Sequence, residues 1–225
     1  MNRRKLLKCG FTGALGITLS LNTLDIFAKD LTQEGFCGAG QPEYGSRLRR
    51  LLKNKKRQPL SLFGGKRASK WGKNKLSYYI VDRDNDLSVD IWDQEFKKAF
   101  DSWSEITPLE FTSVSSYDAD MIISVSGRRR QGFGKTGGVL AWAQLPYTSD
   151  FDGQLWSVFD TAENWILPEE NNGTVLRSVA CHEIGHLLGL SHSSDPEALM
   201  YPYINDAIKP RADDMKKIQR LYGLD

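Results

Sequence analysis

The stretch CHEIGHLLGLSH, from Cys181 to His192, is the most informative part of this 225-residue chain. It contains all three histidines of the sequence, His182, His186 and His192. Residues four apart on a helix share one face and lie about 6 Å apart along the axis, so the first two histidines are predicted to point at one ion. Gly189 lacks a Cβ and can turn the chain sharply, which would bring the third histidine back to the same ion.

Three imidazoles form the protein ligand set of a catalytic zinc, which keeps a fourth position for water. Glu183 directly follows the first histidine, and a carboxylate there can take a proton from the water and pass it to a leaving amine. The pattern H-E-x-x-H-x-x-G-x-x-H is typical of metzincin proteases and predicts one catalytic zinc and peptide hydrolysis. The alternatives are a structural metal site, which would need a fourth protein ligand, or three histidines on a polar helix face.

The N-terminus has the layout of an export signal over residues 1–28, with a basic head, an apolar run and a cleavage point after Ala28. Arg3 and Arg4 favour the twin-arginine route, and an ordinary signal peptide is the alternative. The apolar run is too short for a comfortable membrane span, and no later run is long enough. We therefore expect an exported protein, periplasmic or extracellular, without a stable membrane span.

The charge of the chain is divided unevenly. Residues 44–75 carry twelve Lys or Arg and no acidic residue, whereas residues 76–225 carry 13 basic and 24 acidic residues. A basic run can bind nucleic acid. This one has few aromatic residues and contains the flexible pair Gly64-Gly65, which favours a solvated linker. The expected organisation is therefore a signal (1–28), a propeptide with basic connector (29–69) and one domain (70–225) that binds no nucleic acid.

The domain shows strand patterns first and helix patterns later, which favours α+β architecture. Trp92, Phe96, Ala99, Phe100 and Trp103 recur at helical spacing and predict core packing. The predicted helices cover 91–106, 175–188 and 212–223. The predicted strands cover 76–81, 109–114, 121–126, 138–143 and 155–159.

Several segments of this domain resemble the matrixins, the matrix metalloproteinase family of metzincins, in order along the chain. They are SKWGKNKLSYYIV (69–81), FDSWSEITPLEF (100–111), ADMIIS (119–124), GGVLAWA (137–143) and FDTAENW (159–165). Met200 in DPEALMYPYI stands where metzincins have a methionine turn beneath the zinc, and Ser193 follows the third histidine as it does in matrixins. The resemblance covers about residues 70–223.

The resemblance implies a twisted, mostly parallel five-stranded sheet with three helices. It also implies a secreted zinc-dependent endopeptidase that acts on protein or peptide substrates, and we expect a monomer. Met200 and Gly189 would support the site. Ser178 and Pro202 match positions of the specificity pocket, where Ser178 leaves room for a Leu or aromatic side chain of the substrate.

Two departures from the matrixin pattern concern structural metals. Trp142 and Val158 stand at positions where matrixins carry histidines for a second, structural zinc, so that zinc should be absent. A calcium site is half kept: Asp160 and Glu163 match ligand positions, whereas Gly134 replaces an expected aspartate. Calcium at these two carboxylates is an expectation, and ordinary surface carboxylates are the alternative.

Latency is predicted from FCGAGQPEYG (36–45), which loosely resembles the matrixin cysteine switch. In that switch a thiolate takes the fourth zinc position, and thiolate is a good zinc ligand. We expect Cys37 to be this latent-state ligand, in a zymogen that an activating protease would cut within 53–67. The alternatives are a disulfide with Cys181 or an inert thiol. Cys181, in the predicted active-site helix, is expected to be a buried free thiol.

Overall fold

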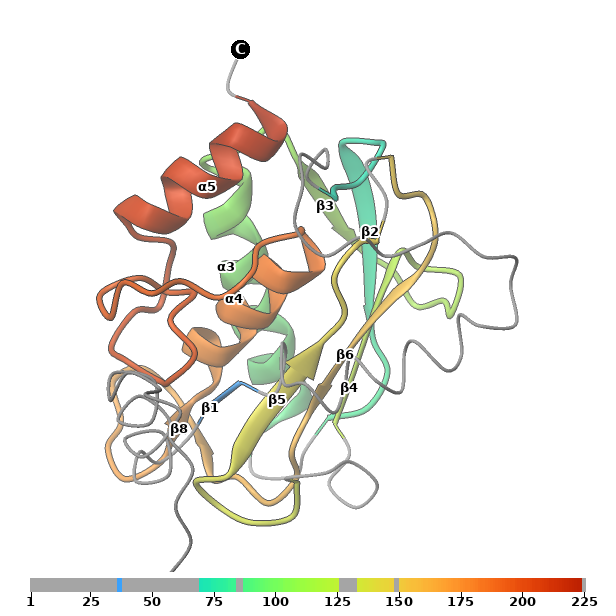
Figure 1. The fold of residues 1–225 in the computed structure, drawn as a ribbon. Coiled ribbons are helices and arrows are strands. Elements are labelled where there is room, and N and C mark those ends of the chain that lie inside the picture. The colour runs from blue at the N-terminus through green and yellow to red at the C-terminus, as the bar shows by residue number, and fades with distance from the viewer. Residues whose placement is uncertain (1–35, 38–68, 84–86, 126–132, 148–149, 224–225) are drawn as a thin grey trace, which may run out of the picture. The chain divides into compact units, whose positions relative to one another are not determined.

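The computed structural model describes residues 36–37, 69–83, 87–125, 133–147 and 150–223, drawn in colour in Figure 1. All of them belong to one compact unit, Glu34–Asp225. The predicted signal peptide and most of the predicted connector lie outside the described residues.

A six-stranded sheet in the order β1-β5-β6-β4-β2-β3 forms one layer of the domain. Its strands are β1 (Phe36–Cys37), β2 (Lys75–Ile80), β3 (Glu110–Ser113), β4 (Met121–Val125), β5 (Val139–Ala143) and β6 (Leu155–Phe159). Neighbouring strands run parallel except β5 and β6, which are antiparallel. Strands β2 to β6 confirm the mostly parallel five-stranded sheet, and β1 extends it by a two-residue strand beside β5.

The strand sequences explain where the sheet is buried. In β2 the apolar side chains Leu76, Tyr78 and Ile80 alternate with more exposed ones, because successive side chains point to opposite faces of a sheet. The central strand β4, MIISV, is buried at four of its five positions, as expected for a strand covered on both faces.

The three predicted helices are all present: α3 (Val89–Ser104), α4 (Leu176–Leu187) and α5 (Ala212–Tyr222). Helix α3 begins after Ser88, whose side chain accepts a hydrogen bond from the amide of Ile91 and so caps the helix. Its predicted apolar stripe is buried, which confirms the core assignment. In Figure 1, α3 and α4 lie together on one side of the sheet.

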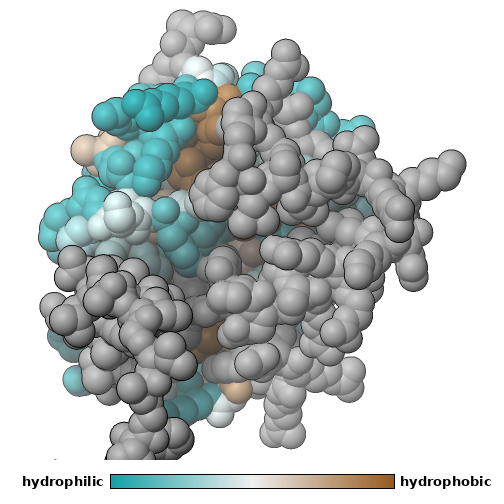
Figure 2. All heavy atoms as spheres, viewed as in Figure 1, coloured by the Kyte–Doolittle hydropathy of each residue, from teal (hydrophilic) through white to brown (hydrophobic). Residues whose placement is uncertain are grey.

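Helix α4 is the central element of the domain, because every residue in it except Arg177 is buried. Arg177 reaches α3 and donates two hydrogen bonds, of 2.6 and 2.9 Å, to the carboxylate of Glu95. Helix α5 has an exposed hydrophilic outer side, visible as teal spheres in Figure 2, and buries Asp214 and Ile218.

The majority of strand and helix ends differ from their predicted positions by one or two residues. Helix α3 begins and ends two residues earlier than predicted because the cap at Ser88 sets its start. A second sheet, β7 (Trp165–Ile166) paired in parallel with β8 (Thr174–Val175), was not predicted, since two-residue strands show no periodicity. Among the described residues, no helix combines the length and apolar character needed to cross a bilayer.

Candidate active site

The chain turns sharply where α4 ends, and this turn determines where the third histidine lies. Gly189 has a φ of 106°, a left-handed conformation that favours glycine. The turn is closed by hydrogen bonds of 2.9 Å from the Gly189 amide to the His186 carbonyl and from the Leu190 amide to the Gly185 carbonyl. The sharp turn predicted at Gly189 is present.

All three histidines converge on one point. The Nε2 atoms of His182 and His186 lie 3.2 Å apart, and those of His186 and His192 also lie 3.2 Å apart. Two nitrogen ligands of one tetrahedral zinc, each roughly 2.0–2.1 Å from the ion, are about 3.3–3.4 Å apart. Within the described part of the chain, this is the one group of three or more His, Cys, Asp or Glu side chains placed to share a metal ion.

Hydrogen bonds fix the tautomers of two of these rings. His182 Nδ1 lies 2.7 Å from the Leu199 carbonyl, and His186 Nδ1 lies 2.7 Å from the Leu190 carbonyl. A carbonyl only accepts, so each Nδ1 carries the proton and each neutral ring turns the lone pair of Nε2 toward the common point. Lone pairs that meet in this way repel one another unless a cation lies between them, so the donor set fits a metal ion.

Burial keeps these rings neutral. It lowers the pKa of His182 to about 4 and that of His192 to about 3, with repulsion from His182 adding to the second shift. The pKa of His186 also falls well below its ordinary value, through burial and then the two neighbouring rings. Neutral imidazole is the form that binds zinc, so at neutral pH no proton competes for the site.

Glu183 lies beside the histidines on α4 and is only 1% exposed. Together with His182 it lines a pocket at the edge of the histidine cluster. The residue predicted to take a proton from the water is therefore buried and borders the pocket.

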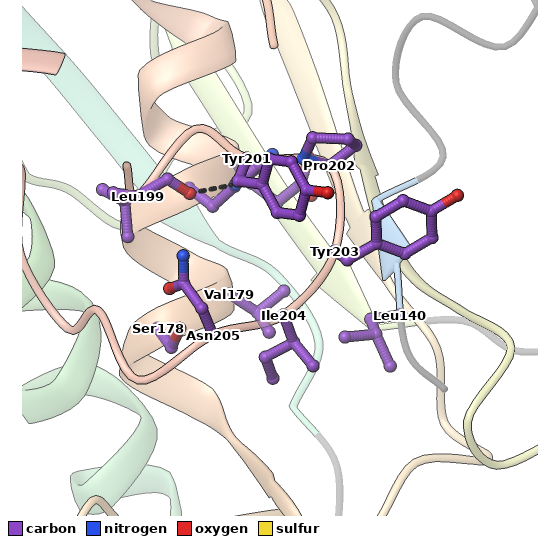
Figure 3. Close-up of a pocket in the computed structure, with 11 residues that line it drawn as sticks. Leu140, Ser178, Val179, Leu199, Tyr201, Pro202, Tyr203, Ile204 and Asn205 are labelled. Carbon is purple, nitrogen blue, oxygen red and sulfur yellow. Dashed lines mark hydrogen bonds between the residues drawn. The ribbon is translucent and has the colours of Figure 1, made fainter. Parts of the chain in front are cut away.

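The pocket, shown in Figure 3, lies between α4, strand β5 and the loop after Met200. Ser178 and Pro202, the two residues predicted for a specificity pocket, both line it. The other lining residues are mostly apolar and come from three parts of the chain: Leu140, Val179, Leu199, Tyr201, Tyr203, Ile204 and Asn205. The Leu199 carbonyl at its edge accepts the hydrogen bond from His182 that is dashed in the figure.

Met200 lies fully buried beneath the histidines, against Gly185 of α4. A Cβ atom on Gly185 would collide with the sulfur of Met200 and would lie 3.0 Å from the ring of Trp103. The helix and the methionine turn can therefore pack this closely only because residue 185 is glycine.

Helix α5 holds the methionine turn through a buried carboxylate. The buried carboxylate of Asp214 accepts hydrogen bonds from the amides of Leu199 (2.7 Å) and Met200 (3.0 Å). The carbonyls of the same two residues accept hydrogen bonds from the histidine region. The Leu199 carbonyl accepts from the ring of His182, and the Met200 carbonyl accepts from the Ser193 amide at 2.7 Å. Sequence reasoning missed Asp214, and its only signal was an acid in the first turn of the last helix.

The two carboxylates matched to a calcium site are buried and bind a loop. Asp160 accepts hydrogen bonds from the amides of Gly134 (2.6 Å) and Ala162 (3.0 Å). Glu163 accepts from the Gly137 amide (2.8 Å) and the Thr174 hydroxyl (3.2 Å), and burial raises its pKa. They are therefore not surface carboxylates, whereas the calcium expectation stays a prediction.

Trp142 and Val158, at the positions matched to structural-zinc histidines, are directly opposite each other on β5 and β6. Neither residue type offers a metal ligand, so this pair does not fit a second zinc. The absence of a structural zinc there stays a prediction.

The two cysteines that follow the predicted signal differ in what the structure describes. Cys181 is a buried free thiol, as expected, 3.1 Å from the Ser102 hydroxyl, and burial raises its pKa to about 12. Cys37 belongs to β1, whose backbone pairs in parallel with β5 in the register Phe36 to Val139 and Cys37 to Ala141. The side chain of Cys37 lies outside what is described.

Comparisons with known proteins agree with this geometry. The family model described as Matrixin matches residues 70–223. The chain is 36% identical over 183 residues to matrix metalloproteinase-C of Caenorhabditis elegans, covering 73% of this chain and 31% of that protein. It is 38% identical over 162 residues to stromelysin-1 of Equus caballus, covering 68% of this chain and 33% of that protein. The chain thus spans about one third of the length of these curated relatives.

Proposed function

Because this chain belongs to the matrixin family, we propose that it is a zinc-dependent endopeptidase with one catalytic zinc bound by His182, His186 and His192. The observation that carries the proposal is the convergence of three Nε2 atoms, two of them forced by carbonyl contacts to present lone pairs. A helical polar face or an unrelated buried cluster would not orient its rings in this way.

The chemistry follows from the order of groups around the pocket. When bound, zinc supplies a Lewis acid that polarises the scissile carbonyl and makes water a nucleophile near neutral pH. Glu183 takes the proton from the attacking water and returns it to the leaving amine. The buried position of Glu183 keeps bulk water from competing for that proton.

The substrate is proposed to be a protein or peptide bound in extended form. Strand β5 lies at the edge of the five-stranded sheet, and an edge strand can pair with an added strand through its backbone. Leu140 of β5 lines the pocket, so a side chain of such a strand would enter it beside Glu183. The lining, with Ser178 and Pro202, suits an apolar side chain.

We further propose that the protein is exported as a latent zymogen. Pairing of β1 with β5 supports this, because β1 then occupies the same backbone edge that a substrate would use. Cys37 is the proposed latent-state zinc ligand, and cleavage in the connector by another protease would remove it. Changing Cys37 to Ser in the full chain should then raise peptide cleavage before processing, and unchanged activity would reject latency by thiolate.

The experiment that tests the enzyme proposal combines metal analysis with peptide cleavage in the activated protein. Wild type should hold one zinc per chain and cleave a peptide library. Glu183→Gln should hold the same zinc and lose at least about a hundredfold of its cleavage rate, the low end of a general-base contribution. Glu105→Gln, an exposed change at the residue that follows α3, is the matched control. A Glu183→Gln variant that cleaves like the control would remove the proposed mechanism.

A further inference from the structure

The C-terminal end of α4 is held by two side chains that are far away in the sequence. Trp71 donates a 2.8 Å hydrogen bond from Nε1 to the Leu187 carbonyl, and Tyr222 donates a 2.8 Å bond from its hydroxyl to the Leu188 carbonyl. The Trp71 amide donates to the same hydroxyl at 3.2 Å, which joins the two side chains. The last carbonyls of a helix have no partner within it, and these two are satisfied by Trp71 and Tyr222.

The segment that carries Trp71 is itself fixed in place. Trp71 is 2% exposed and packs edge-on against Phe151, with ring centroids 4.8 Å apart. Two backbone hydrogen bonds of 2.9 Å flank Trp71. The Gly72 amide donates to the Phe151 carbonyl, and the Phe151 amide donates to the Lys70 carbonyl. The Ser69 carbonyl lies so close to Gly189 that any Cβ there would collide with it.

Burial also keeps the Tyr222 hydroxyl in its donor form, because it raises the pKa of this group above its ordinary value. The ammonium group of Lys70 lies 5.5 Å from the centre of the Tyr222 ring. One hydrogen-bonded unit, the brace, therefore joins residues 69–72, the C-terminal end of α4 and Tyr222.

The braced turn leads directly to the metal ligands. Immediately after Gly189, the Leu190 carbonyl fixes the ring of His186 through a 2.7 Å contact to Nδ1, and His192 follows two residues later. We propose that Trp71 and Tyr222 are positioning residues for the metal centre: by holding the Leu187 and Leu188 carbonyls they set the turn that aims His186 and His192. This inference rests on the proposed zinc site.

The brace also limits where a maturing cut can fall. A cut on the C-terminal side of Trp71 would remove the Leu187 partner and the Ser69 contact, and would loosen the metal centre. The inference therefore places any activating cut before Ser69.

The test is the rate at which the full-length zinc-loaded protein releases zinc to an excess of a colorimetric chelator. Tyr222→Phe removes only the hydroxyl, and should release zinc roughly tenfold faster, the low end of what outer partners of metal ligands contribute. Trp71→Phe should change the rate in the same direction. Tyr78→Phe is the matched control, because Tyr78 is a buried tyrosine of β2 whose ring stacks on Phe100 of α3. Thermal unfolding of each variant verifies that release is measured in the folded state.

The outcomes are distinguishable. If wild type holds no zinc, the proposed function fails. If wild type holds zinc but Tyr222→Phe releases it at the wild-type rate, or at the same changed rate as Tyr78→Phe, the positioning role is wrong and the zinc site stands.

Discussion

His182 donates a 2.7 Å hydrogen bond from Nδ1 to the carbonyl of Leu199, seventeen residues further along the chain. The amide of Leu199 in turn donates to the buried carboxylate of Asp214 in α5. The single residue Leu199 thus links α5 to the first histidine, so the orientation of that ring depends on an acid that never touches it.

We expect Asp214→Asn to weaken both the fold and the metal site. The new amide group would place a donor against the amides of Leu199 and Met200, leaving at least one of them buried without an acceptor. The expected loss is about 1–3 kcal/mol in the free energy of unfolding, measured by urea denaturation, together with faster zinc release. Asp206→Asn, at an exposed carboxylate bound to Arg211, should leave the free energy of unfolding close to that of wild type. Equal effects of the two variants would contradict this account.

Gly185→Ala should destabilise the domain by about 1–3 kcal/mol, because the added methyl group overpacks the space between α4 and Met200. A double-mutant cycle with Met200→Ala identifies the cause. If the clash with Met200 is the reason, the Gly185→Ala change should cost less in the Met200→Ala background. Identical costs in both backgrounds, measured by thermal or urea unfolding, would show that the destabilisation does not come from a clash with Met200.

The lowered pKa of Glu95 predicts that part of the free energy of unfolding is lost in acid. Burial opposes its ionisation, but hydrogen bonds from Arg177 and Lys98 outweigh this and lower its pKa. Its folded pKa is therefore below the unfolded value of about 4.3, so the stabilisation is complete above that pH and is lost as pH falls through the folded pKa.

Glu95→Gln should therefore cost about 3 kcal/mol at pH 7, near the lower end for a broken buried ion pair, because Arg177 loses its partner. The difference from wild type should shrink below about pH 4, as seen in urea midpoints collected from pH 3 to 7. Glu110→Gln removes an exposed pair with Lys75 and should show neither effect. A pH-independent difference at residue 95 would mean that its charge is not what stabilises the helices.

Cys181 should resist alkylation in the folded protein. Its thiol is buried and its pKa is raised to about 12, so almost no thiolate is present at neutral pH. Iodoacetamide followed by peptide mapping should leave this residue unmodified until denaturant is added. Rapid native labelling at Cys181 would show that the end of α3 and the middle of α4 separate more easily than their packing indicates.

Much of this arrangement is predictable from local patterns. The histidine spacing, the glycine after α4 and the apolar stripe of α3 each depend on periodicity within one element, and the structure reproduces them. What was missed depends on contacts between distant segments. Asp214 lies next to Leu199 only because α5 packs against the methionine turn, and Trp71 meets Leu187 across 116 residues.

The pocket shows the same division. Ser178 and Pro202 were predicted because they belong to segments that carry a recognisable pattern. Leu140 joins them from β5, and a strand residue alone gives no sign of which neighbour it will face. The two carboxylates matched to a calcium site are a second example. The sequence identifies Asp160 and Glu163, whereas only the fold shows that their oxygens accept hydrogen bonds from a loop backbone.

Helix α5 ends at Tyr222 and supplies Asp214, so both of its links to the histidine region are made by the last helix of the domain. During translation the imidazoles therefore leave the ribosome well before the groups that align them. The final geometry of the three imidazoles can form only after α5 has been synthesised.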